Sequence, residues 1–220
     1  MKGKKSIIVS IVLLLLFALL TILLMFGPTN YIGETNKEIG LVSLNEKYSY
    51  LEYNKVLDFI SDIPLFLSIA IIGILAVLGA IQLVKRKSLF KVDKGITIFG
   101  IFIVILAGFW IVFDKFLVVN YRPILINGEV EASYPSTHIL LVTFTILSSI
   151  SILYKYLKNR KVIIIFNLIG SLLISVTFAF RLASGMHWFT DCVGGMLLGL
   201  SLYCLYIALK KEKMIEKENL

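Results

Sequence analysis

Six long apolar runs dominate this 220-residue chain and restrict what it can fold into. A helical run of about 20 residues, rising about 1.5 Å per residue, matches the roughly 30 Å hydrocarbon core of a bilayer. The composition, with 58% hydrophobic and 16% charged residues, excludes a water-soluble globule. We therefore predict an all-α polytopic membrane protein, in which residues 1–220 form one domain built as a six-transmembrane-helix bundle. The predicted spans are Ser6–Phe26, Ile63–Val84, Gly95–Val119, Ser136–Leu157, Val162–Phe180 and Phe189–Leu209.

Positive charges lie mainly on one side of this predicted bundle. Sixteen Lys and Arg and four Asp and Glu fall on the side of the termini, against six and ten on the other side. Because Lys and Arg flanking the spans are retained in the cytoplasm, both termini, including the tail at 210–220, are predicted to be cytoplasmic. This distribution accounts for the pI near 9.4 without a nucleic-acid partner. The first run is too long for a signal peptide and lacks a cleavage site, which predicts an uncleaved anchor.

The long extracytoplasmic connection covers residues 27–62. Leu44, Tyr48 and Leu51 have helical spacing, which predicts a short amphipathic helix lying in the outer interface. We interpret the segment as an interfacial tether with an aromatic belt, and keep a substrate-selecting lid as the alternative.

Three further features receive a structural interpretation. The Gly195-x-x-x-Gly199 pattern allows close helix approach and is interpreted as packing within the bundle. Cys192 and Cys204 are too far apart for a disulfide in one helix and are interpreted as small packing residues. The external acidic pair Glu129 and Glu131 is interpreted as a solvated edge, with sensing of a substrate head group as the alternative.

Ionisable residues gather where the predicted spans end on the extracytoplasmic side, although each costs about 2.5–3.5 kcal/mol at membrane depth. Lys115 and Arg122 are seven residues apart, so a continuous helix would point both the same way. Three cations, two histidines and one carboxylate predict a site for a multiply charged anion, and phosphate suits the Arg and Lys donors. A helix start at Pro-Ser-Thr adds unpaired backbone amides. The candidates are Lys115, Arg122, Ser136, Thr137, His138, Arg181, His187 and Asp191.

Three motifs in order resemble the signature of the type 2 phosphatidic acid phosphatase family, the membrane relatives of vanadium haloperoxidases. They are K-x6-R-P from Lys115, Pro-Ser-Thr-His at 135–138 and R-x5-H-x3-D from Arg181. The resemblance implies a metal-independent phosphatase without a cofactor that works through a phosphohistidine. It implies His187 as the nucleophile, Asp191 as the group that orients it, and His138 as general acid and then base. The implied phosphate-binding residues are Lys115, Arg122, Ser136, Thr137 and Arg181.

Two positions depart from the family pattern. Thr137 stands where the family usually has glycine, and a β-branched residue disfavours positive φ, so we expect an ordinary backbone conformation there. Phe180 stands where the family usually has serine, which removes one hydroxyl. Neither change touches the acid–base residues, so we expect an altered rate or substrate preference rather than inactivity.

The implied activity is hydrolysis of a lipid phosphate or diphosphate at the outer leaflet of a cell membrane, in a chain short enough to be bacterial. The implied substrates are of the undecaprenyl diphosphate, phosphatidylglycerophosphate or phosphatidic acid type. One alternative is a lipid phosphotransferase that uses the same site. Another is a transporter or sensor in which His138, His187 and Asp191 bind a divalent metal, although three nearby cations disfavour it.

Overall fold

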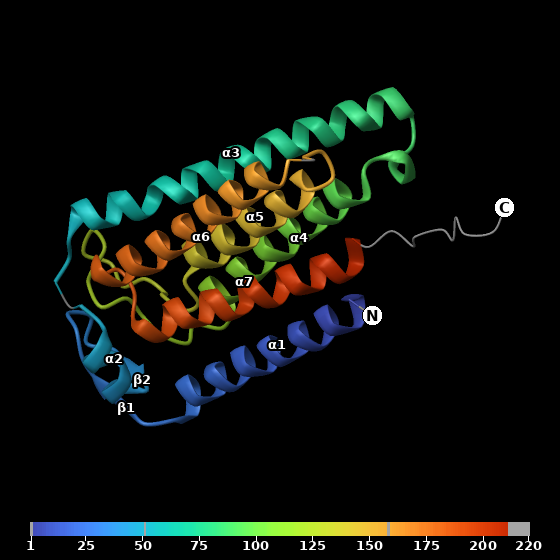
Figure 1. The fold of residues 1–220 in the computed structure, drawn as a ribbon. Coiled ribbons are helices and arrows are strands. Elements are labelled where there is room, and N and C mark those ends of the chain that lie inside the picture. Colours follow the sequence, from blue (N-terminus) through green and yellow to red (C-terminus); the bar gives the residue numbers. More distant parts are fainter. Residues whose placement is uncertain (1, 51, 158, 211–220) are drawn as a thin grey trace.

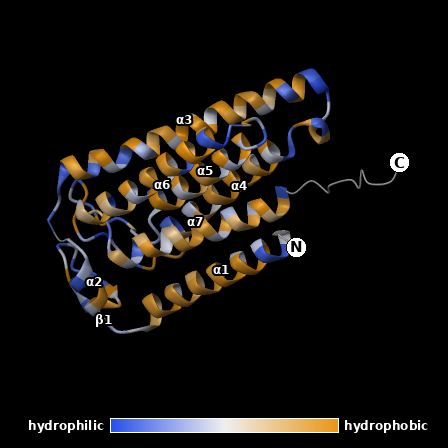
Figure 2. Ribbon diagram, in the orientation of Figure 1, coloured by the Kyte–Doolittle hydropathy of each residue, from blue (hydrophilic) through white to orange (hydrophobic). Residues whose placement is uncertain are grey.

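The structure is a computed structural model that describes residues 2–50, 52–157 and 159–210. Within these residues, six long helices lie side by side and confirm the predicted helical bundle (Figure 1). Most of their surface is apolar, and the hydrophilic residues gather towards the helix ends and loops (Figure 2). The long helices are α1 (Lys2–Phe26), α3 (Lys55–Arg86), α4 (Lys94–Ile111), α5 (Thr137–Leu153), α6 (Arg160–Ala183) and α7 (Phe189–Lys210).

The helices differ in how well they suit a bilayer. Among the described residues, α1, α3, α6, α7 and the stretch Lys94–Phe116 are long and apolar enough to cross a membrane. The remaining helix, α5, has 17 residues and ends at Leu153 rather than at the predicted Leu157. It stops because Tyr154–Tyr156 form a turn, in which the Lys155 and Tyr156 side chains donate hydrogen bonds to Asp93. Most of α5 is buried by the other helices, so the multi-pass fold does not depend on its contact with lipid.

Helices α5 and α7 form the centre of the bundle. A Cβ added to Gly195 would lie 2.5 Å from the Ser136 carbonyl oxygen, and one on Gly199 would lie 3.1 Å from Thr143 Cβ. Both glycines therefore face α5, which confirms packing within the bundle. On its other side α7 contacts α1, where Ser10 Oγ donates a 2.9 Å hydrogen bond to the Ser201 carbonyl.

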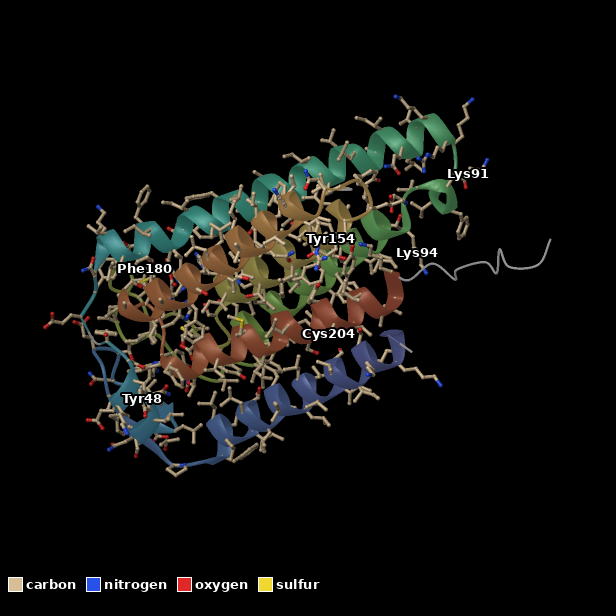
Figure 3. All side chains as sticks on the ribbon, in the orientation of Figure 1. Tyr48, Lys91, Lys94, Tyr154, Phe180 and Cys204 are labelled. Carbon is tan, nitrogen blue, oxygen red and sulfur yellow. The ribbon has the colours of Figure 1, made fainter. Side chains whose placement is uncertain are left out.

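The basic loops lie at one end of the bundle. The start of α1 and the end of α7 lie together at this end (Figure 1), and Lys91 and Lys94 lie there too. Tyr48 and Phe180 lie at the opposite end (Figure 3). The predicted tail begins at the last residue of α7, and residues 211–220 lie outside the described part of the chain.

The connection between α1 and α3 is shorter and more structured than predicted. It holds the antiparallel strands β1 (Thr29–Tyr31) and β2 (Glu38–Gly40) and the helix α2 (Val42–Tyr48). Helix α3 begins at Lys55, eight residues before the predicted span, because the Asn54 side chain accepts hydrogen bonds from the Val56 and Leu57 amides.

Helix α2 covers the start of α7. Its Asn45 is buried and accepts a 3.1 Å hydrogen bond from the Thr190 amide, while Ser49 Oγ accepts one of 2.9 Å from the Phe189 amide. The exposed face carries Leu44 and Tyr48, in agreement with the predicted amphipathic helix, whereas Leu51 lies outside the described residues. The segment therefore caps α7 with polar side chains, a role that the tether interpretation did not include.

Candidate functional site

A histidine and an aspartate are buried together where α7 begins. The side chain of His187 is 3% exposed and that of Asp191 is 0% exposed, and His187 Nδ1 lies 3.5 Å from Asp191 Oδ2. The carboxylate is held in place, because the Trp188 amide donates to Oδ2 at 3.0 Å and Asn120 Nδ2 donates to Oδ1 at 3.4 Å. The predicted pairing of His187 with Asp191 is therefore present in the geometry.

Asn120 is a site residue that the sequence interpretation missed. It is fully buried, and its Oδ1 accepts a 3.1 Å hydrogen bond from the Gly40 amide. Asn120 therefore connects strand β2 to Asp191. The only sequence signal was a lone amide side chain between the apolar residues before it and Arg122.

Arg122 faces the other ring nitrogen of His187. Arg122 Nη1 lies 3.5 Å from His187 Nε2 and donates a 3.2 Å hydrogen bond to the Met186 carbonyl. Arg122 Nε donates a 3.0 Å hydrogen bond to Glu131, so Glu131 is the ion-pair partner of a site residue rather than only a solvated edge. The loop is held by the Tyr121 to Ala132 bridge.

Lys115 does not join this group. Its side chain is 72% exposed, and its Nζ pairs with Asp114 at 2.8 Å. The expectation that Lys115 and Arg122 share a helix face was wrong, because α4 gives way to a π-helical turn, η2 (Val112–Phe116), and the chain leaves helical geometry at Leu117. Asp114, rather than Lys115, lines the cavity described below.

Two acidic residues on α3 connect Arg181 and His138, and the sequence interpretation placed both in the external segment. Arg181 Nη1 donates to Asp58 Oδ1 and lies 3.6 Å from Asp62 Oδ1. His138 Nε2 lies 3.1 Å from Asp62 Oδ1. The signal that could have identified them is their spacing of four residues directly before an apolar run.

The start of α5 lies beside Asp191. The Ser136 amide donates a 3.0 Å hydrogen bond to the Asp191 carbonyl, which fixes the first turn of α5 against α7. Thr137 is the first residue of α5 and is not among the described residues with positive φ, as expected for a β-branched side chain. The amides of this first turn have no intrahelical acceptors and carry the positive end of the helix dipole.

Several buried polar atoms of these residues have no partner among the described residues. Buried polar atoms are nearly always hydrogen-bonded, so a cluster of exceptions indicates a missing ligand. One is a hydroxyl oxygen and two are nitrogens of a histidine and an arginine side chain. They are Ser136 Oγ, His138 Nδ1 and Arg181 Nε, whereas His187 Nδ1 makes no hydrogen bond but lies beside Asp191.

Burial keeps the nucleophile candidate neutral. Desolvation, together with the positive charges of Arg122 and Arg181, lowers the pKa of His187 well below its ordinary value. His138 also contributes to this lowering of the His187 pKa. A neutral ring whose Nδ1 carries the proton presents a lone pair at Nε2, the atom that faces Arg122.

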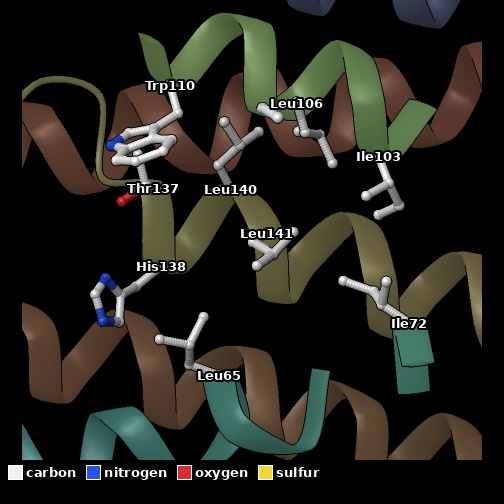
Figure 4. Close-up of a pocket in the computed structure, with 10 residues that line it drawn as sticks. Leu65, Ile72, Ile103, Leu106, Trp110, Thr137, His138, Leu140 and Leu141 are labelled. Carbon is white, nitrogen blue, oxygen red and sulfur yellow. The ribbon is translucent and has the colours of Figure 1, made fainter. Parts of the chain in front are cut away.

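Two cavities share Thr137 and Trp110 as lining residues. The first is polar, has a volume of about 40 Å³, and is lined by Asp114, Arg122 and His187 among others. The second has a volume of about 310 Å³ and lies between α3, α4 and α5 (Figure 4). Thr137 and His138 lie towards one end of this second cavity, and its other walls are apolar. These walls are Leu65, Ile72, Ile103, Leu106, Ala107, Trp110, Leu140 and Leu141.

Metal ligands are not grouped in the described part of the chain. Its His, Cys, Asp and Glu side chains form no cluster of three or more that could hold a metal ion. The site instead contains the guanidinium groups of Arg122 and Arg181 and the imidazoles of His138 and His187. This donor set favours an anion over a cation.

The fold is a multi-pass helical bundle, and one end holds a buried pocket rich in hydrogen-bond donors. These features define a class of membrane protein that binds anionic ligands. Residues 101–215 match the model of the PAP2 superfamily, and the chain belongs to this family. The family predicted from the three motifs is thereby confirmed. Membership supports a membrane phosphatase that acts on lipid phosphates.

A solved structure supports the fold. The chain resembles a transmembrane PAP2 type phosphatidylglycerolphosphate phosphatase from Bacillus subtilis, with a TM-score of 0.59 and 19% identity. The similarity covers 90% of this chain and 94% of the other, and at this identity it is evidence for the fold alone. No curated protein matches the chain significantly.

Proposed function

We propose that this protein hydrolyses a lipid phosphate or diphosphate through a phosphohistidine formed on His187, without a metal. The observation that carries the proposal is that a polar cavity and an apolar cavity lie side by side, with Thr137 and Trp110 lining both. An amphiphile would place its phosphate beside Arg122 and His187 and its hydrocarbon chain between α3 and α4.

The first step is attack on phosphorus by the Nε2 lone pair of His187. A P–N bond forms, and the P–O bond to the lipid breaks in line with it. Asp191 stabilises the positive charge that develops on the ring, because its Oδ2 lies on the Nδ1 side. His138 takes up the proton of the monoanionic substrate phosphate at Nδ1 and donates it to the leaving oxygen, so the lipid departs as an alcohol or as a monophosphate.

The second step returns the enzyme to its starting state. His138, now neutral, removes a proton from water as that water attacks phosphorus, and the P–N bond breaks. Inorganic phosphate leaves with the proton that His138 removed from water, and both histidines are neutral again. Arg122, Arg181, Ser136 and the amides at the start of α5 stabilise charge on the non-bridging oxygens throughout.

We place the site at the outer leaflet. The basic loops gather at the end of the bundle away from the site, and positive loops are retained in the cytoplasm. The phosphate donors at 115–191 therefore face outside, in a cell membrane. The substrate class comprises prenyl diphosphates and glycerophospholipid phosphates, because the apolar cavity accepts a hydrocarbon chain of either kind.

The test is phosphate release by purified protein from undecaprenyl diphosphate, phosphatidylglycerophosphate and phosphatidic acid. We expect release from at least one lipid, inhibition by orthovanadate, and full activity after chelation by EDTA. Loss of activity that zinc or manganese restores would contradict the metal-independent mechanism. Transfer of labelled phosphate to an acceptor lipid, with no free phosphate, would instead identify a phosphotransferase.

The apolar cavity has its own test. The Ala107→Trp substitution would fill the cavity, which Ala107 lines, without touching the polar site. We expect a higher KM for a long-chain phosphatidic acid and an unchanged kcat/KM for glycerol phosphate, which has no chain. An equal effect on both substrates would contradict a role of this cavity in lipid binding.

A further inference from the structure

Helix α3 contributes two carboxylates to a site whose other polar residues lie on the loops and helices from Asp114 onwards. Asp58 and Asp62 are four residues apart, so they lie on one face of α3. Asp58 binds Arg181, and Asp62 lies 3.1 Å from His138. Both acids precede residues 101–215, the region that matches the family model.

The contact of Asp62 fixes the state of the His138 ring. A carboxylate only accepts, so the proton of the neutral ring lies on Nε2 and is donated to Asp62 Oδ1. His138 Nδ1 then carries a lone pair, and this atom is buried without a partner in the described residues. The ring is therefore prepared to accept a proton at Nδ1 and, once protonated, to donate it from there.

We propose that Asp62 is a positioning residue for His138, and this rests on the proposed function of His138 as general acid and base. Asp62 selects the tautomer, holds the ring plane, and stabilises the imidazolium from which Nδ1 donates to the leaving oxygen. Each histidine of the site then has a carboxylate beside the ring nitrogen that does not face the substrate. Asp191 of α7 supports His187, and Asp62 of α3 supports His138.

A purely structural role for Asp62 would act through Arg181. That contact is long, with 3.6 Å between Arg181 Nη1 and Asp62 Oδ1, whereas Asp58 bonds the same nitrogen directly. Asp58 is therefore the matched control, because it shares the helix face and the arginine partner but makes no hydrogen bond to His138 in the described structure. Removal of the Asp58 carboxylate should weaken phosphate binding, and the effect should be the same for substrates with good and with poor leaving groups.

The experiment compares two amphiphilic esters, 4-decylphenyl phosphate and its 2-nitro derivative, with purified full-length protein in detergent. The nitrophenolate leaves readily without a proton, whereas the unsubstituted phenolate depends on the general acid. We expect Asp62→Asn to lower kcat/KM about 100-fold for the unsubstituted ester and less than about 10-fold for the nitro ester. Asp58→Asn should lower both values by the same factor.

Equal losses for the two esters in Asp62→Asn would overturn the assignment, provided that the variant elutes and melts like the wild type. Asp62→Glu keeps the carboxylate and gives a second test if Asp62→Asn does not fold. We expect Asp62→Glu to restore part of the activity on the unsubstituted ester, and no selective restoration would overturn the assignment. Wild-type protein that releases no phosphate from any ester or lipid would overturn the proposed function as well, which separates the two failures.

Discussion

Each end of the bundle holds a polar cluster, but among the described residues only the cluster at the site end contains buried atoms without partners. At the end with the basic loops, Asp93 accepts hydrogen bonds from the Lys155 and Tyr156 side chains and from the Gly95 amide. Lys210 Nζ donates to the carbonyl and the hydroxyl of Ser151. This cluster, which we call the Asp93 cluster, ties α4, α5 and α7 together.

The site end has the same kinds of side chain with a different balance. Atoms of Ser136, His138 and Arg181 are buried without partners in the described residues, at a cost that is typically 1–3 kcal/mol for each such group. A satisfied cluster holds helices together, whereas an unsatisfied one lowers stability until a ligand supplies the partners. The comparison predicts loss of activity from changes at the site and loss of stability from changes at the Asp93 cluster.

The largest effect is expected from His187→Ala. Removal of the nucleophile should lower kcat on the order of 10⁴-fold or more, because no other group can form the covalent intermediate. The protein should still elute as a folded species in detergent. Phosphate release at the wild-type rate would contradict the nucleophile assignment and the comparison of the two ends.

Arg181→Ala should weaken inhibition by orthovanadate about 100-fold, since it removes a buried charged donor from the anion site. The change also leaves Asp58 without its cationic partner, which destabilises the protein. The double variant Arg181→Ala/Asp58→Asn removes that unpaired charge. We expect it to recover stability but not vanadate binding, and recovery of both would contradict a phosphate-binding role.

Arg122→Met and Lys115→Met compare the two cations of the first motif. Arg122 lies beside His187, whereas Lys115 is exposed and paired with Asp114. We expect kcat/KM to fall about 100-fold in Arg122→Met and less than about 10-fold in Lys115→Met. Equal losses would mean that Lys115 turns from Asp114 towards the bound phosphate.

These residues show what the sequence could and could not predict. The helical bundle followed from the lengths of the apolar runs, and the contact of His187 with Asp191 followed from their spacing of four residues, although His187 lies just before α7 begins. Lys115 was not, because the periodicity assumed a continuous helix where η2 begins. No hydropathy pattern distinguishes a π turn from the end of an α-helix.

The acidic half of the site was missed for a different reason. Asp58 and Asp62 lie before the apolar part of α3, so hydropathy assigned them to the external segment. Their partners, His138 and Arg181, are 76 and 123 residues away in the pairs that the structure contains. Contacts at such separations depend on how the helices pack, and one sequence carries no direct record of that packing.

Asp93→Asn should change stability rather than activity. The Asp93 side chain is only 8% exposed, and hydrogen bonds from Lys155, Tyr156 and Gly95 lower the pKa of Asp93 despite its burial. Loss of its charge should cost about 2–3 kcal/mol, which corresponds to roughly 4–10 °C in Tm. Phosphate release below the Tm should stay within about twofold of wild type.

Glu129→Gln removes an exposed carboxylate and should leave both stability and activity unchanged. A change in activity in this variant would favour sensing of the substrate head group.

The smallest effect concerns the pH dependence of stability at the site. Because burial lowers the pKa of His187 below the ordinary 6.5, the unfolded chain binds a proton at this residue that the folded protein does not. Stability from this group is therefore present above about pH 6.5 and is lost as the pH falls towards the lower folded pKa. One pH unit below 6.5, the loss should be about 1.4 kcal/mol, or roughly 3–6 °C in Tm. His187→Gln lacks this titration, so its Tm should fall less between about pH 7.5 and 5.5, as measured by thermal unfolding in detergent. Other groups titrate in both proteins and cancel in the difference, so equal decreases would mean that His187 is not kept neutral by burial.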